Sequence, residues 1–226
     1  MDFSFLPKYY MFFLNGAKVT LLLSLFTVII GVILGVILAL MRLSRIAPLK
    51  MIATAYIEFI RGTPLLVQLF LFYYGLPKLG IQFPEVPALG TAFPEFMAGV
   101  VALSVNSAAY VAETFRAGIQ AIDKGQMEAA RSLGMPHSMA MRFIILPQAI
   151  RNVLPALGNE FIVIIKESSI VSVIGISELM YNADTVRGNS FRPFEPLIIA
   201  ALIYFVITFT LSKILGIAER RMRTSD

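Results

Sequence analysis

The chain has 226 residues, of which 58% are hydrophobic and 15% are charged, whereas a soluble domain is typically about a quarter charged, so the composition indicates a membrane protein of one domain. Cysteine is absent and histidine occurs once, which excludes a disulfide framework, a cysteine nucleophile and a metal site built from several histidines of one copy. The net charge of +5 is expected to lie in cytoplasmic loops rather than to bind nucleic acid, and neither a cofactor nor a metal ion is expected.

Five segments are apolar over roughly the 20 residues that a helix needs to cross a bilayer. The amino-terminal stretch carries little positive charge and an interrupted apolar run, so we expect no cleavable signal peptide and a retained first span. The expected fold is an all-α membrane protein with five transmembrane helices, in which residues 1–226 form a single transmembrane domain. The spans are expected at residues 16–41, 52–76, 96–117, 155–174 and 196–217.

Basic residues are distributed unevenly among the loops that join these spans. The loops at 77–95 and 177–195 mix acids with bases, whereas the other loops and the carboxyl terminus are mainly basic. Because lysine and arginine collect on the cytoplasmic side, the amino terminus is expected outside and the carboxyl terminus in the cytoplasm. The residues that set this orientation are Arg42, Arg45, Lys50, Arg116, Lys124, Arg131, Arg142, Arg151, Arg220, Arg221 and Arg223.

The first two spans contain features that bear on packing and transport. GVILG at residues 31–35 is a small-xxx-small pattern, which lets a neighbouring helix approach closely. In the second span Glu58 and Arg61 lie three residues apart, so they either pair or leave Glu58 to face a transport path. The adjacent Thr63 and Pro64 are expected to kink or unwind this span and to free backbone carbonyls.

Polar side chains on the third and fourth spans recur at helical spacing and therefore share faces of their helices. Such a stripe lines a transport path or bonds to neighbouring helices, and the residues alone leave both readings open. Glu113, near the cytoplasmic end of the third span, is expected to pair with Arg116. The candidate substrate-binding residues are Glu58, Asn106, Ser107, Asn159 and Glu160.

Between the third and fourth spans, residues 123–147 form a charged, interrupted helical segment. Asp123 can cap a first helix, and Gly134 can end it in a left-handed conformation. Pro136 then fits the first turn of a second helix, which returns to the membrane and ends at Pro147. Two helices with a sharp corner are therefore expected in the cytoplasm, where they either enter a groove of another protein or lie on the membrane surface.

This segment contains a motif that residue type and spacing define. It reads Glu128-Ala129-Ala130, Gly134, Ile144 and Leu146-Pro147. The pattern resembles, without departure, the EAA motif of permease subunits in ABC (ATP-binding cassette) importers. Three further stretches, at 57–77, 106–135 and 154–179, resemble the polar amino-acid uptake branch of that family, so the resemblance covers most of the chain from Ile57 to Leu179.

The resemblance implies a set of partners in a bacterial or archaeal inner membrane, where lipid surrounds the spans. A second permease copy or a close paralogue would complete the translocation path, and an extracytoplasmic binding protein would deliver the amino acid. Two cytoplasmic ATP-binding cassette ATPase subunits would bind below. The residues that would couple to a cleft in each ATPase are Glu128, Ala129, Ala130 and Gly134.

The chain itself is expected not to be an enzyme, because it has no GxxxxGK[ST] phosphate loop and ATP hydrolysis would reside on partner subunits. Glu58 and Glu160 favour a cationic substrate such as arginine, lysine or histidine, since a cation best stabilises a buried carboxylate. The alternative function is an ion-coupled secondary amino-acid transporter, in which Glu58, Glu113 and Glu160 would bind protons or sodium.

Overall fold

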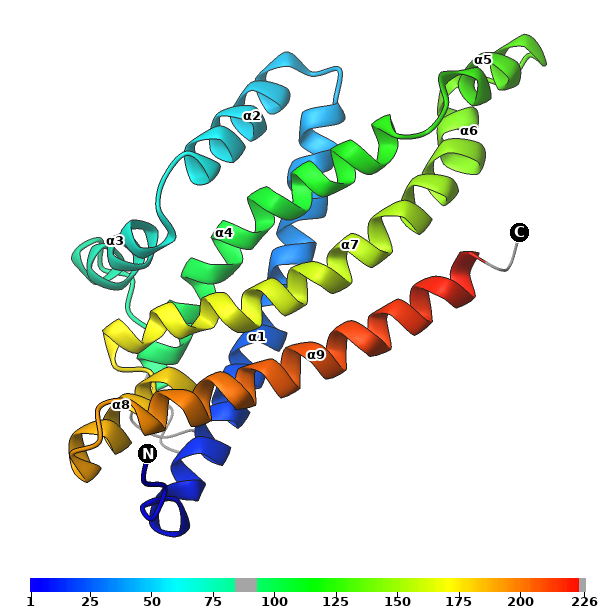
Figure 1. Cartoon of the computed structure of the whole chain (residues 1–226). Coiled ribbons are helices and arrows are strands. Elements are labelled where there is room, and N and C mark those ends of the chain that lie inside the picture. The colour runs from blue at the N-terminus through cyan, green and yellow to red at the C-terminus, as the bar shows by residue number, and fades with distance from the viewer. Residues whose placement is uncertain (84–92, 224–226) are drawn as a thin grey trace.

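The computed structural model describes residues 1–83 and 93–223, and the regular elements of these residues are helices (Figure 1). The all-α expectation is therefore confirmed for the described chain. The elements are α1 (Leu6–Leu43), α2 (Ala47–Arg61), α3 (Leu65–Lys78), α4 (Phe93–Gln120), α5 (Lys124–Ser132), α6 (His137–Ala140), a π-helical turn (Met141–Ile145), α7 (Leu146–Glu167), 3-10 turns (Ser168–Ile174), α8 (Leu179–Ser190) and α9 (Glu195–Arg223).

The centre of the bundle is the pair α1 and α4, which lie against each other along much of their length. A Cβ atom at Gly35 would lie 2.5 Å from Cγ1 of Val111, and one at Gly31 would lie 2.9 Å from Oγ of Ser107. Both glycines therefore face α4 and permit an approach that a larger side chain would prevent. The packing role predicted for the GVILG stretch is confirmed.

An apolar core joins this pair to α3 and to the 3-10 turns that follow α7. Its side chains are almost completely buried within the chain. Because lipid tails are as apolar as these side chains, close van der Waals packing rather than removal from water stabilises such a core in a membrane. The fully buried members of this core are Leu23, Leu69, Val100, Ala102, Leu103, Val171, Ile174 and Ile176.

The second expected span is broken into two helices. α2 and α3 meet at an angle of 109°, and the break falls at residues 62–64. Pro64 has no N–H and disfavours a helical conformation at the preceding Thr63, so the sequence at this point cannot continue the α-helix. The expected interruption at Thr63 and Pro64 is confirmed, and its sharpness exceeds a simple kink.

Three described helices, α1, α4 and α9, are long and apolar enough to cross a membrane, and the bent pair α2–α3 would make a fourth span. These helices cover the first, third, fifth and second expected spans. The fourth expected span, 155–174, falls on α7 and the 3-10 turns and does not form a long apolar helix. The reason is its composition, because the carboxyl-terminal part of α7 carries Asn159, Glu160, Lys166 and Glu167.

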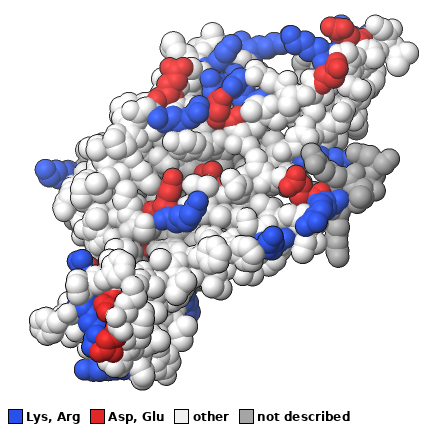
Figure 2. Space-filling model, viewed as in Figure 1, with Lys and Arg blue, Asp and Glu red and all other residues white. Residues whose placement is uncertain are grey.

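The two ends of the molecule differ in which elements they carry. In Figure 1 the α1–α2 turn, α5, α6 and the carboxyl end of α9 lie toward the upper and right side, while α3 lies at the left and the amino terminus and α8 lie toward the lower left. Charged side chains gather at these ends, and the band between them is mostly uncharged apart from a small mixed group over α7 (Figure 2). This distribution is typical of a protein whose middle lies in lipid.

The first residues of the chain are tied to the start of α9. The backbone N–H of Asp2 donates to Oε1 of Glu195 at 3.1 Å, and Arg192 forms an ion pair with Asp2. Hydrogen bonds from Ser4 and the nearby guanidinium of Arg192 hold the pKa of the Asp2 carboxyl below its usual range. Because folding lowers this pKa, the contact stabilises the folded chain at pH values above the ordinary carboxyl pKa. This stabilisation disappears as the pH falls through the lowered pKa and the carboxylate becomes protonated.

Candidate functional site

The break between α2 and α3 is held by the buried side chain of Gln68. Its Nε2 donates to the carbonyl of Ile60 at 2.7 Å and to the carbonyl and hydroxyl oxygens of Thr63 at 3.0 and 2.9 Å. In a continuous helix the Ile60 carbonyl would accept from the N–H of residue 64, which is a proline without that donor. The Gln68 amide therefore takes the place of the donor that Pro64 lacks, and its bond to the Ile60 carbonyl is shorter than the 3.4 Å bonds that the N–H and the hydroxyl of Thr63 make to the same oxygen.

Asn106 connects the same break to α4. Its Nδ2 donates to Oε1 of Gln68 at 2.9 Å, and the Asn106 side chain is buried. We expected Asn106 to be a substrate-binding candidate, and the structure places its amide in the network that fixes the bend. Gln68 was not among the candidate residues, and its spacing of four residues after Pro64 is the signal that could have identified its role.

Two of the candidate substrate residues meet where α4 faces α7. Oγ of Ser107 donates to Oε1 of Glu160 at 3.0 Å. Ser107 is buried beside Gly31 of α1, whereas Glu160 is partly exposed. The pair thus lies where α1, α4 and α7 approach one another, and the Glu160 carboxylate remains partly accessible there. A carboxylate so placed can receive a cationic amino group.

The other two candidates lie apart from this pair. Glu58 on α2 and Asn159 on α7 are exposed, and no hydrogen bond or ion pair joins either side chain to another residue that the structure describes. The Glu58–Arg61 pair is therefore not formed. The Arg61 guanidinium lies instead over the ring of Tyr110, 5.6 Å from its centroid.

The carboxylate of Glu113 on α4 forms ion pairs with three arginines, which belong to three different helices. Nη1 of Arg42 on α1 lies 2.6 Å from Oε2 of Glu113, Nη1 of Arg61 on α2 lies 3.9 Å from the same oxygen, and Arg116 pairs with Glu113 within α4. The predicted Glu113–Arg116 pair is confirmed. The cluster also fastens α1 and α2 to α4, so the polar stripe on α4 bonds to neighbouring helices over this part of its length.

Residues 123–147 form the expected pair of helices with a corner. The Asp123 carboxylate accepts the backbone N–H of Gly125 at 2.6 Å and caps α5, as predicted. Gly134 has a φ of 83°, so the predicted left-handed end of this helix is also confirmed. Pro136 occupies the N-cap position before the first residue of α6, where its side chain makes no capping hydrogen bond, rather than a place within the first turn as expected.

The second helix of this segment does not end at Pro147, contrary to expectation. A π-helical turn at Met141–Ile145 lets the backbone N–H of Leu146 reach the carbonyl of Met141. Pro147 then occupies the first turn of α7, where a missing N–H is tolerated. The chain therefore runs as one nearly continuous helical path from α6 into α7, which joins the corner mechanically to the fourth expected span.

The corner presents part of its surface to solvent. Glu128 and Ala129 are exposed, whereas Ala130 is 2% exposed and packs against its own chain. Leu133, next to Gly134, is 85% exposed. The sequence reasoning did not single out Leu133, although an apolar residue beside a helix-ending glycine in a polar segment is a recognisable signal. Leu133 therefore adds an apolar side chain to the exposed surface of the corner.

Sequence reasoning also missed the buried carboxylate of Glu178. It accepts the backbone N–H groups of Met180 and Tyr181 at 2.9 and 2.7 Å, and the hydroxyl of Tyr204 donates to it at 2.8 Å. Oγ1 of Thr20 lies 3.5 Å away on α1. Glu178 thus caps α8 and links α1, α8 and α9. We had treated this acid only as part of a loop of mixed charge.

Comparisons with known proteins give consistent results over nearly the whole chain. Residues 31–224 match the family described as binding-protein-dependent transport system inner membrane component. The arginine transport system permease protein ArtQ of Bacillus subtilis (strain 168) is 45% identical, over 100% of this chain and 99% of that protein. The probable glutamine ABC transporter permease protein GlnM of the same organism is 43% identical over 100% of both. A solved structure described as an amino acid ABC transporter with histidines superposes with a TM-score of 0.90 and 56% identity, over 98% of this chain and 99% of that chain.

Proposed function

This chain belongs to the family of binding-protein-dependent transport system inner membrane components, and from that membership we propose that it is the permease of an ATP-driven importer for polar amino acids of the arginine, glutamine and histidine type. It is an inner-membrane permease component rather than the ATPase, and the family implies ATPase and binding-protein partners. Relatives named for arginine and glutamine, and a solved relative described with histidines, support the substrate class.

The projecting corner between α5 and α6 is the observation that carries this proposal. It lies at the end of the bundle, exposes Glu128, Ala129 and Leu133, and continues through α6 into α7 (Figure 1). A surface helix of this kind fits a groove in another protein. We assign the corner to contact with a cytoplasmic ATPase, one for each of two permease copies, so that closure of the ATPase pair moves α7 through Gly134.

The arrangement in the membrane follows from the same proposal. Five spans are formed by α1, the bent pair α2–α3, α4, α7 with its 3-10 turns, and α9, with the amino terminus outside. The polar residues of α7 support a position against the transport path, because polar groups inside a membrane face protein or water rather than lipid. A second permease, identical or closely similar, would cover that side.

Reconstitution in proteoliposomes tests this function. Amino-acid uptake is expected only when the permease, an ATPase, the binding protein and ATP are all present. Uptake should persist when proton and sodium gradients are collapsed by ionophores. Uptake by the permease alone under an ion gradient, insensitive to ATP, would establish the ion-coupled alternative instead.

The Ser107–Glu160 pair is our choice for the centre of the substrate site, and Asn106 holds the neighbouring bend. Glu58 and Asn159 remain candidates for contact with substrate, although they lie apart from this pair. Glu160→Gln keeps an oxygen for the Ser107 hydroxyl but removes the charge that would meet a substrate amino group. We expect the substrate concentration for half-maximal uptake to rise about tenfold, as loss of about 1.4 kcal/mol of binding requires.

The matched comparison for this variant is Glu167→Gln, which removes a carboxylate from the same helix seven residues away. It is expected to change half-maximal uptake much less. An equal rise in both variants would show a general effect of charge on α7 and would contradict contact with Glu160.

A further inference from the structure

A cavity of about 840 Å³ lies between the carboxyl end of α3 and the first turn of α4. It is at the end of α4 opposite the α5–α6 corner, and so on the outer side of the membrane in the proposed orientation. The cavity lies away from the Ser107–Glu160 pair, which joins the middle of α4 to the carboxyl-terminal part of α7. Its position is where a substrate released by a binding protein would first meet the permease.

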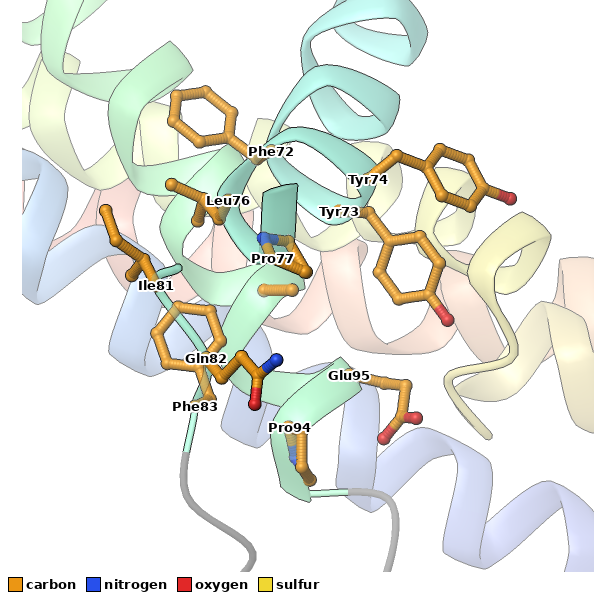
Figure 3. Close-up of a pocket in the computed structure, with 11 residues that line it drawn as sticks. Phe72, Tyr73, Tyr74, Leu76, Pro77, Ile81, Gln82, Phe83, Pro94 and Glu95 are labelled. Carbon is orange, nitrogen blue, oxygen red and sulfur yellow. The ribbon is translucent and has the colours of Figure 1, made fainter. Parts of the chain in front are cut away.

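Glu95 gives this cavity its charge. Its side chain extends from the start of α4 into the cavity, and Tyr73 points toward it from α3 (Figure 3). Oε2 of Glu95 is buried and has no hydrogen-bond partner among the residues that the structure describes. A carboxylate oxygen without a donor is unfavourable, so a ligand that supplies a donor would stabilise the site.

Aromatic rings form much of the remaining wall. Phe72, Tyr73 and Tyr74 line the cavity, and the rings of the two tyrosines lie 4.9 Å apart. Neither lysine nor arginine is among the described residues that line it. Ring faces beside an unpaired carboxylate attract a guanidinium or an ammonium group, which binds the rings by cation–π attraction and the acid by charge-assisted hydrogen bonds.

We propose that this cavity is a first binding site for the cationic side chain of a basic amino acid, with Glu95 as its counter-ion and Tyr73 as its aromatic wall. The inference rests on the proposed function and adds to it a site on the outer side that selects for charge before the substrate reaches Glu160. Gln82, which also lines the cavity, offers an amide to the polar backbone end of the same ligand.

The chain contains no tryptophan, which makes a local reporter possible. In the assembled permease–ATPase complex, Tyr73→Trp places an indole in the cavity wall and keeps its aromatic face. Titration with arginine is expected to change the indole fluorescence relative to the complex without this substitution. Citrulline, which has the shape of arginine but a neutral urea group, is expected to bind about tenfold more weakly, the factor that about 1.4 kcal/mol gives.

Adding Glu95→Gln in the same background is expected to weaken arginine binding about tenfold and to leave citrulline binding unchanged. Glu95→Asp keeps the charge and should retain the preference for arginine. Asp184→Asn removes an exposed acid from α8, outside the cavity, and serves as the matched control. Equal affinity for arginine and citrulline, or arginine binding unaffected by Glu95→Gln, would overturn the proposal.

The outcomes separate this inference from the proposed function. If the complete transporter imports amino acids with ATP while the indole detects no charge preference, the cavity site is wrong and the function stands. If no ATP-dependent uptake occurs with any polar amino acid, the function fails whatever the cavity binds. If the Glu95→Gln variant does not assemble, the Tyr73→Trp complex still tests the cavity site. Weaker binding of citrulline than of arginine supports the site, and equal binding overturns it.

Discussion

Gly134→Val is expected to separate ATP hydrolysis from transport, with ATPase activity retained and amino-acid uptake lowered about tenfold or more. Gly134 forms the corner between α5 and α6 with a φ of 83°. A side chain in this left-handed region costs about 1–2 kcal/mol, and a shift of about 1.4 kcal/mol changes the population of the native corner about tenfold. The α5 helix could then still dock, but its motion would no longer be passed through α6 to α7.

Two comparisons make this prediction specific to the corner. Gly134→Asn should transport nearly as well as the unmodified chain, because asparagine tolerates the left-handed conformation. Gly188→Val places the same side chain on α8, where nothing lies within 4 Å of the added Cβ, and should have little effect. Uptake and ATP hydrolysis are measured in the same proteoliposomes. Normal coupled transport by Gly134→Val would contradict the proposed role of this corner.

Gln68→Leu is expected to cause the largest loss of stability among substitutions at the bend. The leucine is of similar size, but it leaves the carbonyls of Ile60 and Thr63 and the amide of Asn106 without the partner that Gln68 gave them. Each buried polar group left unpaired costs about 1–3 kcal/mol. The apparent melting temperature of the purified complex should therefore fall, and uptake should fall with it.

A double-mutant cycle tests whether the two amides act together. Gln68→Leu combined with Asn106→Leu removes the orphaned amide as well as its partner, so the double variant should be less destabilised than the sum of the two single variants. Strict additivity of the three melting temperatures would show that the hydrogen bond between Gln68 and Asn106 contributes nothing. Met is a second replacement for Gln68 if the leucine variant does not assemble.

The parts of this molecule that local chemistry determines were predictable from the sequence. Asp123 and Gly134 act within one turn of their own helix, so a cap and a left-handed end could be recognised from residue type and spacing. The Thr63–Pro64 break was predictable for the same reason. The predicted packing of the Gly31–Gly35 face also holds, because small residues at this spacing have few other uses in a membrane helix.

Features that depend on the meeting of distant segments were not predictable in the same way. The 109° angle between α2 and α3 depends on Gln68 finding both the freed carbonyls and an amide on α4. Nothing in the sequence around Glu178 indicates that the hydroxyl of Tyr204, on a later helix, donates a hydrogen bond to its carboxylate. The continuation of helix through Pro147 depended on a π-helical turn, which has no reliable sequence pattern.

The hydrogen bonds that Gln68 makes between α2, α3 and α4 join neutral groups only, namely two side-chain amides, a hydroxyl and backbone carbonyls. A transmembrane voltage does work only on charge that moves across the bilayer, about 2.3 kcal/mol for each elementary charge per 100 mV. Breaking and remaking these hydrogen bonds would by itself move no charge across the bilayer. The hydrogen bonds should therefore be equally strong in an energised cell and in a depolarised one.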